Sequence, residues 1–276
     1  MPGAREQANF HEALYRRAYK GICRPRPYHV LRAGRIARER LAWMRSWLRP
    51  GGQVLDLGCG GGELVYLLAR HGFAAEGLDC DRQYVEYARQ ELGLAVSAGS
   101  WDGQNRPAAS LDAILLFHVL EHIPNPVACL QTLRQWLRSN GRLVIEVPNL
   151  EFRGQRPRNR YHPAHVLHFS PRTLAAAGAA AGLEPLRIET SADGGNVRAV
   201  FAPAPKPSPC QGIPGQCGQI LAAERNYAAW QYWLSPHSLT RTLRRIARMA
   251  EERWTSWWSG PRTFDPKRFL DGLSCP

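Results

Sequence analysis

The stretch Val54–Glu63, VLDLGCGGGE, decides the fold of this 276-residue chain. An apolar run containing one acid, Asp56, ends in a loop with glycine at every second position (Gly58, Gly60 and Gly62), and a helix-like apolar run begins at Leu64. This order predicts a buried strand, a tight loop and the start of a helix. Glycines in such a loop allow backbone N–H groups to approach a ligand where a side chain would collide with it.

The spacing of these glycines narrows the class of ligand. A dinucleotide fingerprint requires G-x-G-x-x-G, and counting from Gly58 its last glycine would fall on Glu63. The loop therefore favours a nucleoside ligand that carries no pyrophosphate.

Outward from this loop, segments with strand and helix patterns alternate. We expect strands over 53–57, 74–78, 95–98, 111–117, 142–147, 186–190 and 197–201, and helices over 28–48, 63–71, 81–92, 126–138, 170–182 and 238–258. Asp81 and Ser170 are expected to cap their helices, and Asp193–Asn196 (DGGN) predicts a hairpin turn. Alternation of this kind indicates an α/β, Rossmann-like sheet of seven mostly parallel strands, with helices on both faces and the last strand antiparallel.

Charge divides the chain into parts. Residues 1–49 carry a net charge of +9, residues 50–217 are neutral, and residues 218–276 carry +4. We expect a basic helical segment over 1–49, a catalytic domain over 50–202, a Pro/Gly-rich linker over 203–217 and a helical Trp/Arg-rich extension over 218–276. The basic flanks indicate either an anionic partner or a solvated arginine-rich face.

Composition also indicates the compartment. No apolar run approaches the ~20 residues of a membrane span, and the first residues lack the apolar stretch of a secretory signal. Seven cysteines without a C-x-x-C pair give neither a disulfide framework nor a zinc pattern. We therefore expect a cytoplasmic protein, with contact at the inner face of a membrane as an alternative.

Several separated motifs resemble those of one enzyme family. The glycine loop is similar to the first motif of the class I S-adenosylmethionine-dependent methyltransferases. Phe117–Pro126 (FHVLEHIPNP) resembles a segment of the branch that includes the ubiquinone-biosynthesis O-methyltransferases, and Val147–Asn149 (VPN) and Ala164–Pro171 (AHVLHFSP) follow in that branch's order. The resemblance covers about residues 40–202 and also matches the predicted strand order.

The resemblance implies S-adenosylmethionine as cofactor. The residues expected to bind it are Asp56, Gly58, Cys59, Gly60, Gly62, Asp79, Cys80, Ser100, Trp101 and Phe117. Asp79 ends the second strand, where a carboxylate can accept both ribose hydroxyls. Ser100 departs from the acid that the family often has there, so Asp102 is an alternative, and Trp101 either stacks on the base or fills the core.

Four histidines are candidate catalytic bases for deprotonating an acceptor, namely His118, His122, His165 and His168. The alternative is structural, with these rings only bracing the loops that carry them. Related enzymes are thought to bind a divalent ion at this segment, but their first residue is often Glu where this chain has His118. We therefore expect no metal.

The sequence defines the residues that would bind the methyl acceptor less clearly than those that would bind the cofactor. Arginines at 153, 156, 158 and 160, with Tyr161 and His162, are either a clamp for an anionic group or a surface loop. The helix over 239–258 is either an interfacial membrane helix or a cap on the domain. We expect methyl transfer, with oxygen favoured, to a small-molecule, lipid-linked or glycan acceptor. An RNA methyltransferase and a non-catalytic cofactor-binding scaffold are the alternatives, although the neutral central domain and the lack of an RNA-binding motif disfavour nucleic acid.

Overall fold

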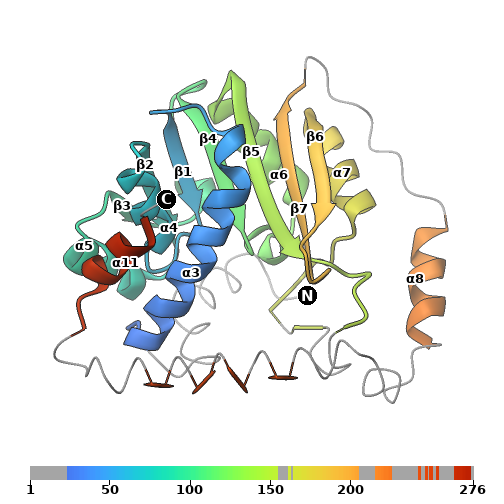
Figure 1. Ribbon diagram of the computed structural model, residues 1–276. Helices are drawn as coiled ribbons and strands as arrows, with labels where there is room; N and C mark the ends of the chain where they lie inside the picture. The colour runs from blue at the N-terminus through green and yellow to red at the C-terminus, as the bar shows by residue number, and fades with distance from the viewer. Residues whose placement is uncertain are drawn as a thin grey trace. The chain divides into compact units, whose positions relative to one another are not determined.

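The computed structural model contains the predicted seven-stranded sheet (Figure 1). It describes residues 24–154, 161–162, 164–204, 215–225 and 264–274, and the pairs 242–243, 246–247, 249–250 and 253–254. The strands are β1 (Gln53–Leu57), β2 (Ala74–Asp79), β3 (Val96–Ala98), β4 (Leu111–Phe117), β5 (Leu137–Pro148), β6 (Leu183–Thr190) and β7 (Asn196–Pro203), in the order β3-β2-β1-β4-β5-β7-β6. The β3-β2-β1-β4 pairings are parallel, and β7 is antiparallel to β5 and β6, as predicted.

Helices alternate with these strands. They are α3 (Pro27–Met44), α4 (Glu63–Arg70), α5 (Arg82–Leu92), α6 (Pro126–Trp136), α7 (Pro171–Ala180), α8 (Gln216–Arg225) and α11 (Pro266–Ser274). Two predicted caps are confirmed: Asp81 accepts the N–H groups of Gln83 and Tyr84, and Ser170 accepts that of Thr173. The capped helices therefore begin where the sequence places them.

Three predicted boundaries are wrong: α3 ends at Met44 instead of 48, β6 begins at Leu183 instead of 186, and the boundary between α6 and β5 is shifted. The helix expected to reach Arg138 ends at Trp136, and β5 begins at Leu137 instead of 142. An ion pair between Arg138 and the buried Asp112 of β4 holds this stretch, and Ser110 donates its N–H to the Trp136 carbonyl at 2.9 Å. These contacts keep residues 137–141 in strand conformation, although Ser139–Gly141 has the composition of a turn.

The described residues form two compact units, the first drawn from residues 1–116, 136–142 and 251–276. Its core is β1, whose Leu55 is fully buried between β2 and β4. The last helix, α11, packs against α3, α4 and α5. Leu270 of α11 is buried close to Gly34 of α3, and Asp271 accepts a hydrogen bond from Tyr66 of α4 at 2.8 Å. The end of the chain is thus part of the glycine-loop unit.

The second unit comprises residues from 117–135 and 143–250. Its framework is the antiparallel pairing of β5 with β7, in which Glu146 lies directly opposite Arg198. Gly178 of α7 allows a close approach to β7, since a Cβ at this position would lie 2.5 Å from the ring of Phe201. Arg134 of α6 donates to the carbonyls of Gly182 and Ala204 and so anchors both ends of the β6–β7 hairpin.

Two predicted segments fall largely outside the described residues. Residues 205–214 of the expected linker lie outside the described residues. Of the expected helix over 239–258, the structure describes the pairs 242–243, 246–247, 249–250 and 253–254, which are helical, and the other 12 positions lie outside the described residues. Among the residues that the structure describes, no helix has the length and apolar character needed to span a membrane.

Candidate functional site

The glycine loop adopts a backbone that requires glycine. Gly58, Gly60 and Gly62 have φ values of 80°, 58° and 83°, in the left-handed region that disfavours other residues. Gly58 donates its N–H to the Leu78 carbonyl at 2.7 Å, and Gly62 is the N-cap of α4. A Cβ at Gly62 would lie 2.6 Å from Leu94. The loop therefore follows a tight path from the end of β1 to the start of α4 that residues with a side chain would not adopt without strain.

Asp79 ties the end of β2 to this loop. Its Oδ2 accepts the N–H of Gly60 at 2.7 Å, and its Oδ1 accepts the N–H of Asp81 at 2.8 Å. A carboxylate has about four lone-pair sites, so each oxygen retains capacity for a further donor such as a ribose hydroxyl. Asp79 thus braces the loop as well as standing where the sequence predicts a sugar contact.

Asp56 lies at the end of β1 within a group of charges. Burial raises the pKa of Asp56 to about 7, the charge of Arg40 on α3 opposes this rise, and the negative charges of Asp79 and Glu63 add to it. All four residues belong to the same unit. Three carboxyl groups and one guanidinium therefore meet at this end of the unit, and Asp56 is about half protonated at pH 7.

The other predicted cofactor residues differ in exposure. Cys59 is buried beside Gly77, and Cys80 is half-buried. Ser100 is exposed and precedes the short 3-10 helix η3 (Trp101–Gly103), in which Trp101 is half-buried. Asp102 is exposed in the same helix, and Phe117 is buried at the end of β4.

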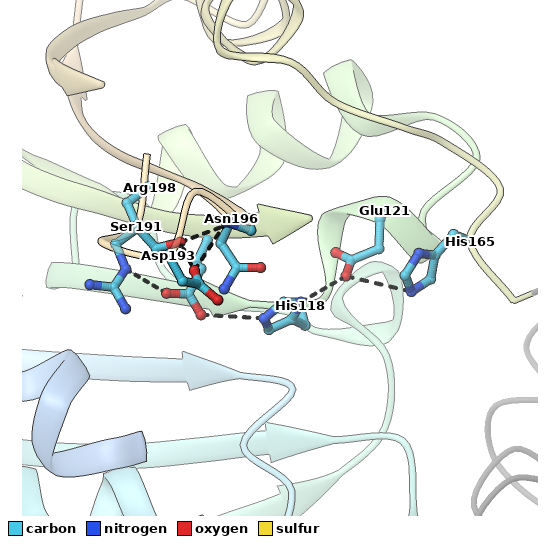
Figure 2. A network of polar contacts seen from close by, with 9 residues as sticks. His118, Glu121, His165, Ser191, Asp193, Asn196 and Arg198 are labelled. Carbon is cyan, nitrogen blue, oxygen red and sulfur yellow. Dashed lines mark hydrogen bonds and ion pairs between the residues drawn. The ribbon is translucent and has the colours of Figure 1, made fainter. Parts of the chain in front are cut away.

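In the second unit, His118 lies between two buried carboxylates (Figure 2). Its Nδ1 is 3.3 Å from Glu121 Oε1 and its Nε2 is 3.3 Å from Glu146 Oε1. The carboxylates are 1% and 2% exposed, whereas the His118 side chain is 38% exposed. His118 also has a φ of 59°, and its backbone N–H donates to the Glu146 carbonyl at 2.9 Å. A non-glycine residue in this conformation is strained, and such residues cluster at functional sites.

The remaining candidate histidines gather around Glu121. His122 Nδ1 lies 2.9 Å from the Ala164 carbonyl, so it must donate there, which leaves the Nε2 lone pair as the acceptor of the neutral ring. His165 Nε2 lies 3.9 Å from Glu121 Oε1, and its ring centroid is 4.9 Å from that of His122 and 6.3 Å from that of His168. The fold thus brings together two motifs about 40 residues apart in the chain.

The electrostatics of this cluster favour neutral imidazoles beside a charged carboxylate. Burial lowers the pKa of His165 to about 4 and also lowers the pKa values of His162 and His168. Burial alone would raise the pKa of Glu121, but the hydrogen bond and charge of His118, with the charge of His122, outweigh it and hold that pKa below its usual value. Neutral imidazoles at pH 7 can accept a proton from an acceptor hydroxyl.

The same residues have the spacing of a cation site. Glu121, His122 and His165 each offer a ligand atom, and these atoms lie within 4.8 Å of one another. Glu121 Oε2 is buried without a hydrogen-bond partner in the structure. An N/O ligand set of this kind suits a divalent ion, so these are the residues that could hold one.

Two charged residues of this region were not predicted from the sequence. Glu146 Oε2 accepts a hydrogen bond from Arg198 Nε at 2.7 Å, and both side chains are largely buried. The only sequence signal was an acid inside the apolar strand around Val144–Val147. Of the predicted acceptor loop, Tyr161 is exposed with its ring edge-on to His168 at 5.2 Å, whereas Arg156, Arg158 and Arg160 lie outside the described residues.

Comparison with known proteins places this geometry in context. A family model described as a methyltransferase domain matches residues 29–188. The ubiquinone biosynthesis O-methyltransferase of Xanthomonas axonopodis pv. citri is 30% identical over 158 residues, which cover 52% of this chain and 64% of that protein. The match therefore spans less than two thirds of the relative's length.

Solved structures agree in fold. A SAM-dependent methyltransferase from Archaeoglobus fulgidus matches with a TM-score of 0.54 and 17% identity, covering 68% of this chain and 98% of that chain. The [4+2]-cyclase SpnF matches with a TM-score of 0.50 and 17% identity, covering 63% and 81%. At such identities the likeness concerns the fold alone, and the second match shows a protein named for another reaction with the same fold.

Proposed function

This chain belongs to the methyltransferase domain family, and we propose that it transfers the methyl group of S-adenosylmethionine to a small-molecule, lipid-linked or glycan acceptor. We favour an oxygen atom as the site of methylation. The observation that carries the proposal is the glycine loop, in which Gly58, Gly60 and Gly62 are left-handed and the Gly60 N–H is bound by the Asp79 carboxylate. The N–H groups of these three glycines are bonded within the protein, so the loop contributes a surface without side chains that the cofactor can approach closely, and Asp79 offers acceptors to its ribose.

The sulfonium supplies an electrophilic methyl group, so the chain's own task is to hold an acceptor and remove its proton. Alignment of the reacting atoms contributes several kcal/mol to the barrier reduction, and a positioned base adds roughly 10²–10⁴-fold. When bound, the cofactor would supply the methyl group and its sulfur would leave with the bonding electron pair, while an imidazole of this chain would take the proton of the acceptor hydroxyl. His122 suits this role because its hydrogen bond to the Ala164 carbonyl fixes its tautomer and leaves Nε2 as the acceptor, whereas the pKa of about 4 makes His165 the weaker base.

The test is methyl transfer from labelled S-adenosylmethionine to a panel of acceptors, comprising a catechol, a polyprenylated catechol, an oligosaccharide, an aliphatic amine, a thiol and tRNA. We expect labelled product with one of the first three and an O-methyl group by mass spectrometry. A labelled amine or thiol would overturn the preference for oxygen. Transfer to tRNA with a steep salt dependence would favour the RNA methyltransferase. Cofactor binding with no transfer to any acceptor would favour the non-catalytic scaffold.

We also propose that the segment 239–258 contacts an anionic membrane surface, where a lipid-linked acceptor would reside. Its described apolar side chains include Leu243 and Trp254, which are 65% and 66% exposed, and arginines are interspersed with them in the sequence. This composition is typical of interfacial helices. Sedimentation with phosphatidylglycerol vesicles should carry the protein down, and Leu243→Ser with Ile246→Ser should reduce this. Failure to sediment with anionic vesicles would contradict the contact.

A further inference from the structure

We propose that Glu146 and Arg198 are positioning residues that act through His118 on Glu121 and His165. The inference rests on the proposed function, because it assigns these two residues a part in the same methyl-transfer site. Figure 2 shows the contacts as one continuous network that runs from Arg198 on β7 to His165 in the loop after β5.

The first step is the pairing of Arg198 with Glu146. The two residues are opposite each other in the register of β5 and β7, so their side chains share one face of the sheet. Arg198 Nε donates to Glu146 Oε2 at 2.7 Å, with the side chains 11% and 2% exposed. A buried carboxylate of this kind requires a partner, and truncating that partner leaves an uncompensated charge.

The second step is the contact of Glu146 with His118, through both its carboxylate and its backbone carbonyl. Oε2 of the carboxylate contacts Arg198 and Oε1 contacts the His118 ring, so Glu146 bridges the guanidinium and the imidazole. The backbone carbonyl of Glu146 also accepts the His118 N–H at 2.9 Å. Glu146 therefore holds His118 twice, at the residue whose φ of 59° needs external support.

The third step transmits this placement to the cluster. With Nε2 directed at Glu146, the ring presents Nδ1 to Glu121 Oε1 at 3.3 Å, and the same oxygen lies 3.9 Å from His165 Nε2. The Glu121 carbonyl also accepts the N–H groups of Val166 and Leu167, next to His165. Rotation of His118 would thus displace both the carboxylate and the loop that carries His165. Partners that orient metal-bound histidines typically change activity by about 10–100-fold, and we expect an effect of the same size for these histidines.

The test uses Arg198→Met and a matched control, Arg187→Met. Arg187 lies on neighbouring β6, its side chain is 57% exposed, and it pairs with Glu189 at 2.7 Å. Removing Arg187 leaves a carboxylate that is 28% exposed to water, whereas removing Arg198 leaves one that is 2% exposed. We expect Arg198→Met to lower kcat by about 10–100-fold with the KM for S-adenosylmethionine within about twofold, since the glycine loop and Asp79 are untouched. Arg198→Lys keeps the charge without the planar fork and should recover part of kcat. Arg187→Met should retain the wild-type kcat.

Two further measurements keep the proposal falsifiable. Imidazole NMR, with the His165 signals assigned by comparison with His165→Asn, should show shifted resonances in Arg198→Met and unchanged ones in Arg187→Met. This readout requires no turnover, so it separates failure of the inference from failure of the proposed function. If Arg198→Met does not fold, the double variant Glu146→Leu/Arg198→Met removes both charges together and should fold with a reduced kcat. Wild-type kcat or unshifted His165 signals in the folded variants would overturn the proposal.

Discussion

Replacement of Asp56 by Asn should change how the stability of the protein depends on pH. Burial raises the pKa of Asp56 from 3.8 to about 7 in the folded protein. The folded state therefore keeps the Asp56 proton over a pH range in which the unfolded chain has released it. Since the unfolded chain binds fewer protons there, the contribution of Asp56 makes stability fall as pH rises from about 4 to about 7 and leaves it constant above that range.

The magnitude follows from the shift. One pKa unit corresponds to about 1.4 kcal/mol, so the interval from pH 5 to the folded pKa of about 7 corresponds to about 3 kcal/mol. Asn carries no proton to release and has nearly the same shape. The free energy of unfolding of Asp56→Asn minus that of wild type should therefore be about 3 kcal/mol larger at pH 8 than at pH 5.

Urea denaturation of the cofactor-free protein at pH 5 and pH 8, followed by circular dichroism, measures this difference. Asp102→Asn is the matched control, because this side chain is exposed and stays in water in both states. Its difference from wild type should be the same at both pH values. A constant difference for Asp56→Asn as well would refute the argument that burial of this carboxyl in the folded state raises its pKa.

Three other changes separate cofactor binding, packing and metal dependence. Asp79→Ala removes the acceptor of the Gly60 and Asp81 N–H groups and should weaken S-adenosylhomocysteine binding by about 10–100-fold. Asp81→Ala removes a helix cap and should cost about 1 kcal/mol of stability while leaving the affinity unchanged. Equal affinities for the two variants would contradict this assignment. Leu270→Ala should destabilise the protein by about 2–5 kcal/mol in thermal or urea unfolding, because Leu270 is buried where α11 packs against α3, α4 and α5. Arg268→Ala, at an exposed position of the same helix, should cost less than about 0.5 kcal/mol, and an equally small cost for Leu270→Ala would contradict the packing of α11. Methyl transfer should persist in excess EDTA; loss of activity that Mg²⁺ or Mn²⁺ restores would show that Glu121, His122 and His165 hold an ion.

Local patterns predicted much of the fold. The bounds of β1 and β4 match the expected 53–57 and 111–117, and the caps Asp81 and Ser170 lie where they were predicted. These features depend on neighbours in the chain, such as the acid-to-amide bonds of the first helical turn. The mostly parallel seven-stranded sheet with an antiparallel last strand followed from the alternation of elements and from resemblance to a known family.

Features fixed by distant contacts were missed. Residues 137–141 contain a turn-like Asn-Gly pair, but the Arg138–Asp112 ion pair joins them to β4 and they are part of β5. Helix α11 was also missed, although Asp265 followed by proline is a helix-start signal and Asp265 does accept the N–H of Lys267. A nine-residue helix is marginal by itself, and here the burial of Leu270 supports it.

The candidate site likewise contains residues that were predicted from the sequence and residues that were not. The four histidines at 118, 122, 165 and 168 were predicted from their motifs, and the structure brings them together around Glu121. The partners Glu146 and Arg198 were not predicted, because their contact depends on the register between β5 and β7, 52 residues apart. A single sequence gives no measure of that register beyond the alternation of each strand.

Isothermal titration calorimetry of the folded wild-type protein with S-adenosylhomocysteine tests most directly whether the loop at 58–62 and Asp79 form a nucleoside site. We expect saturable heat with one ligand per chain, and none with NADH, whose pyrophosphate the glycine spacing does not accommodate. No heat with S-adenosylhomocysteine, or equal binding of NADH, would contradict the account.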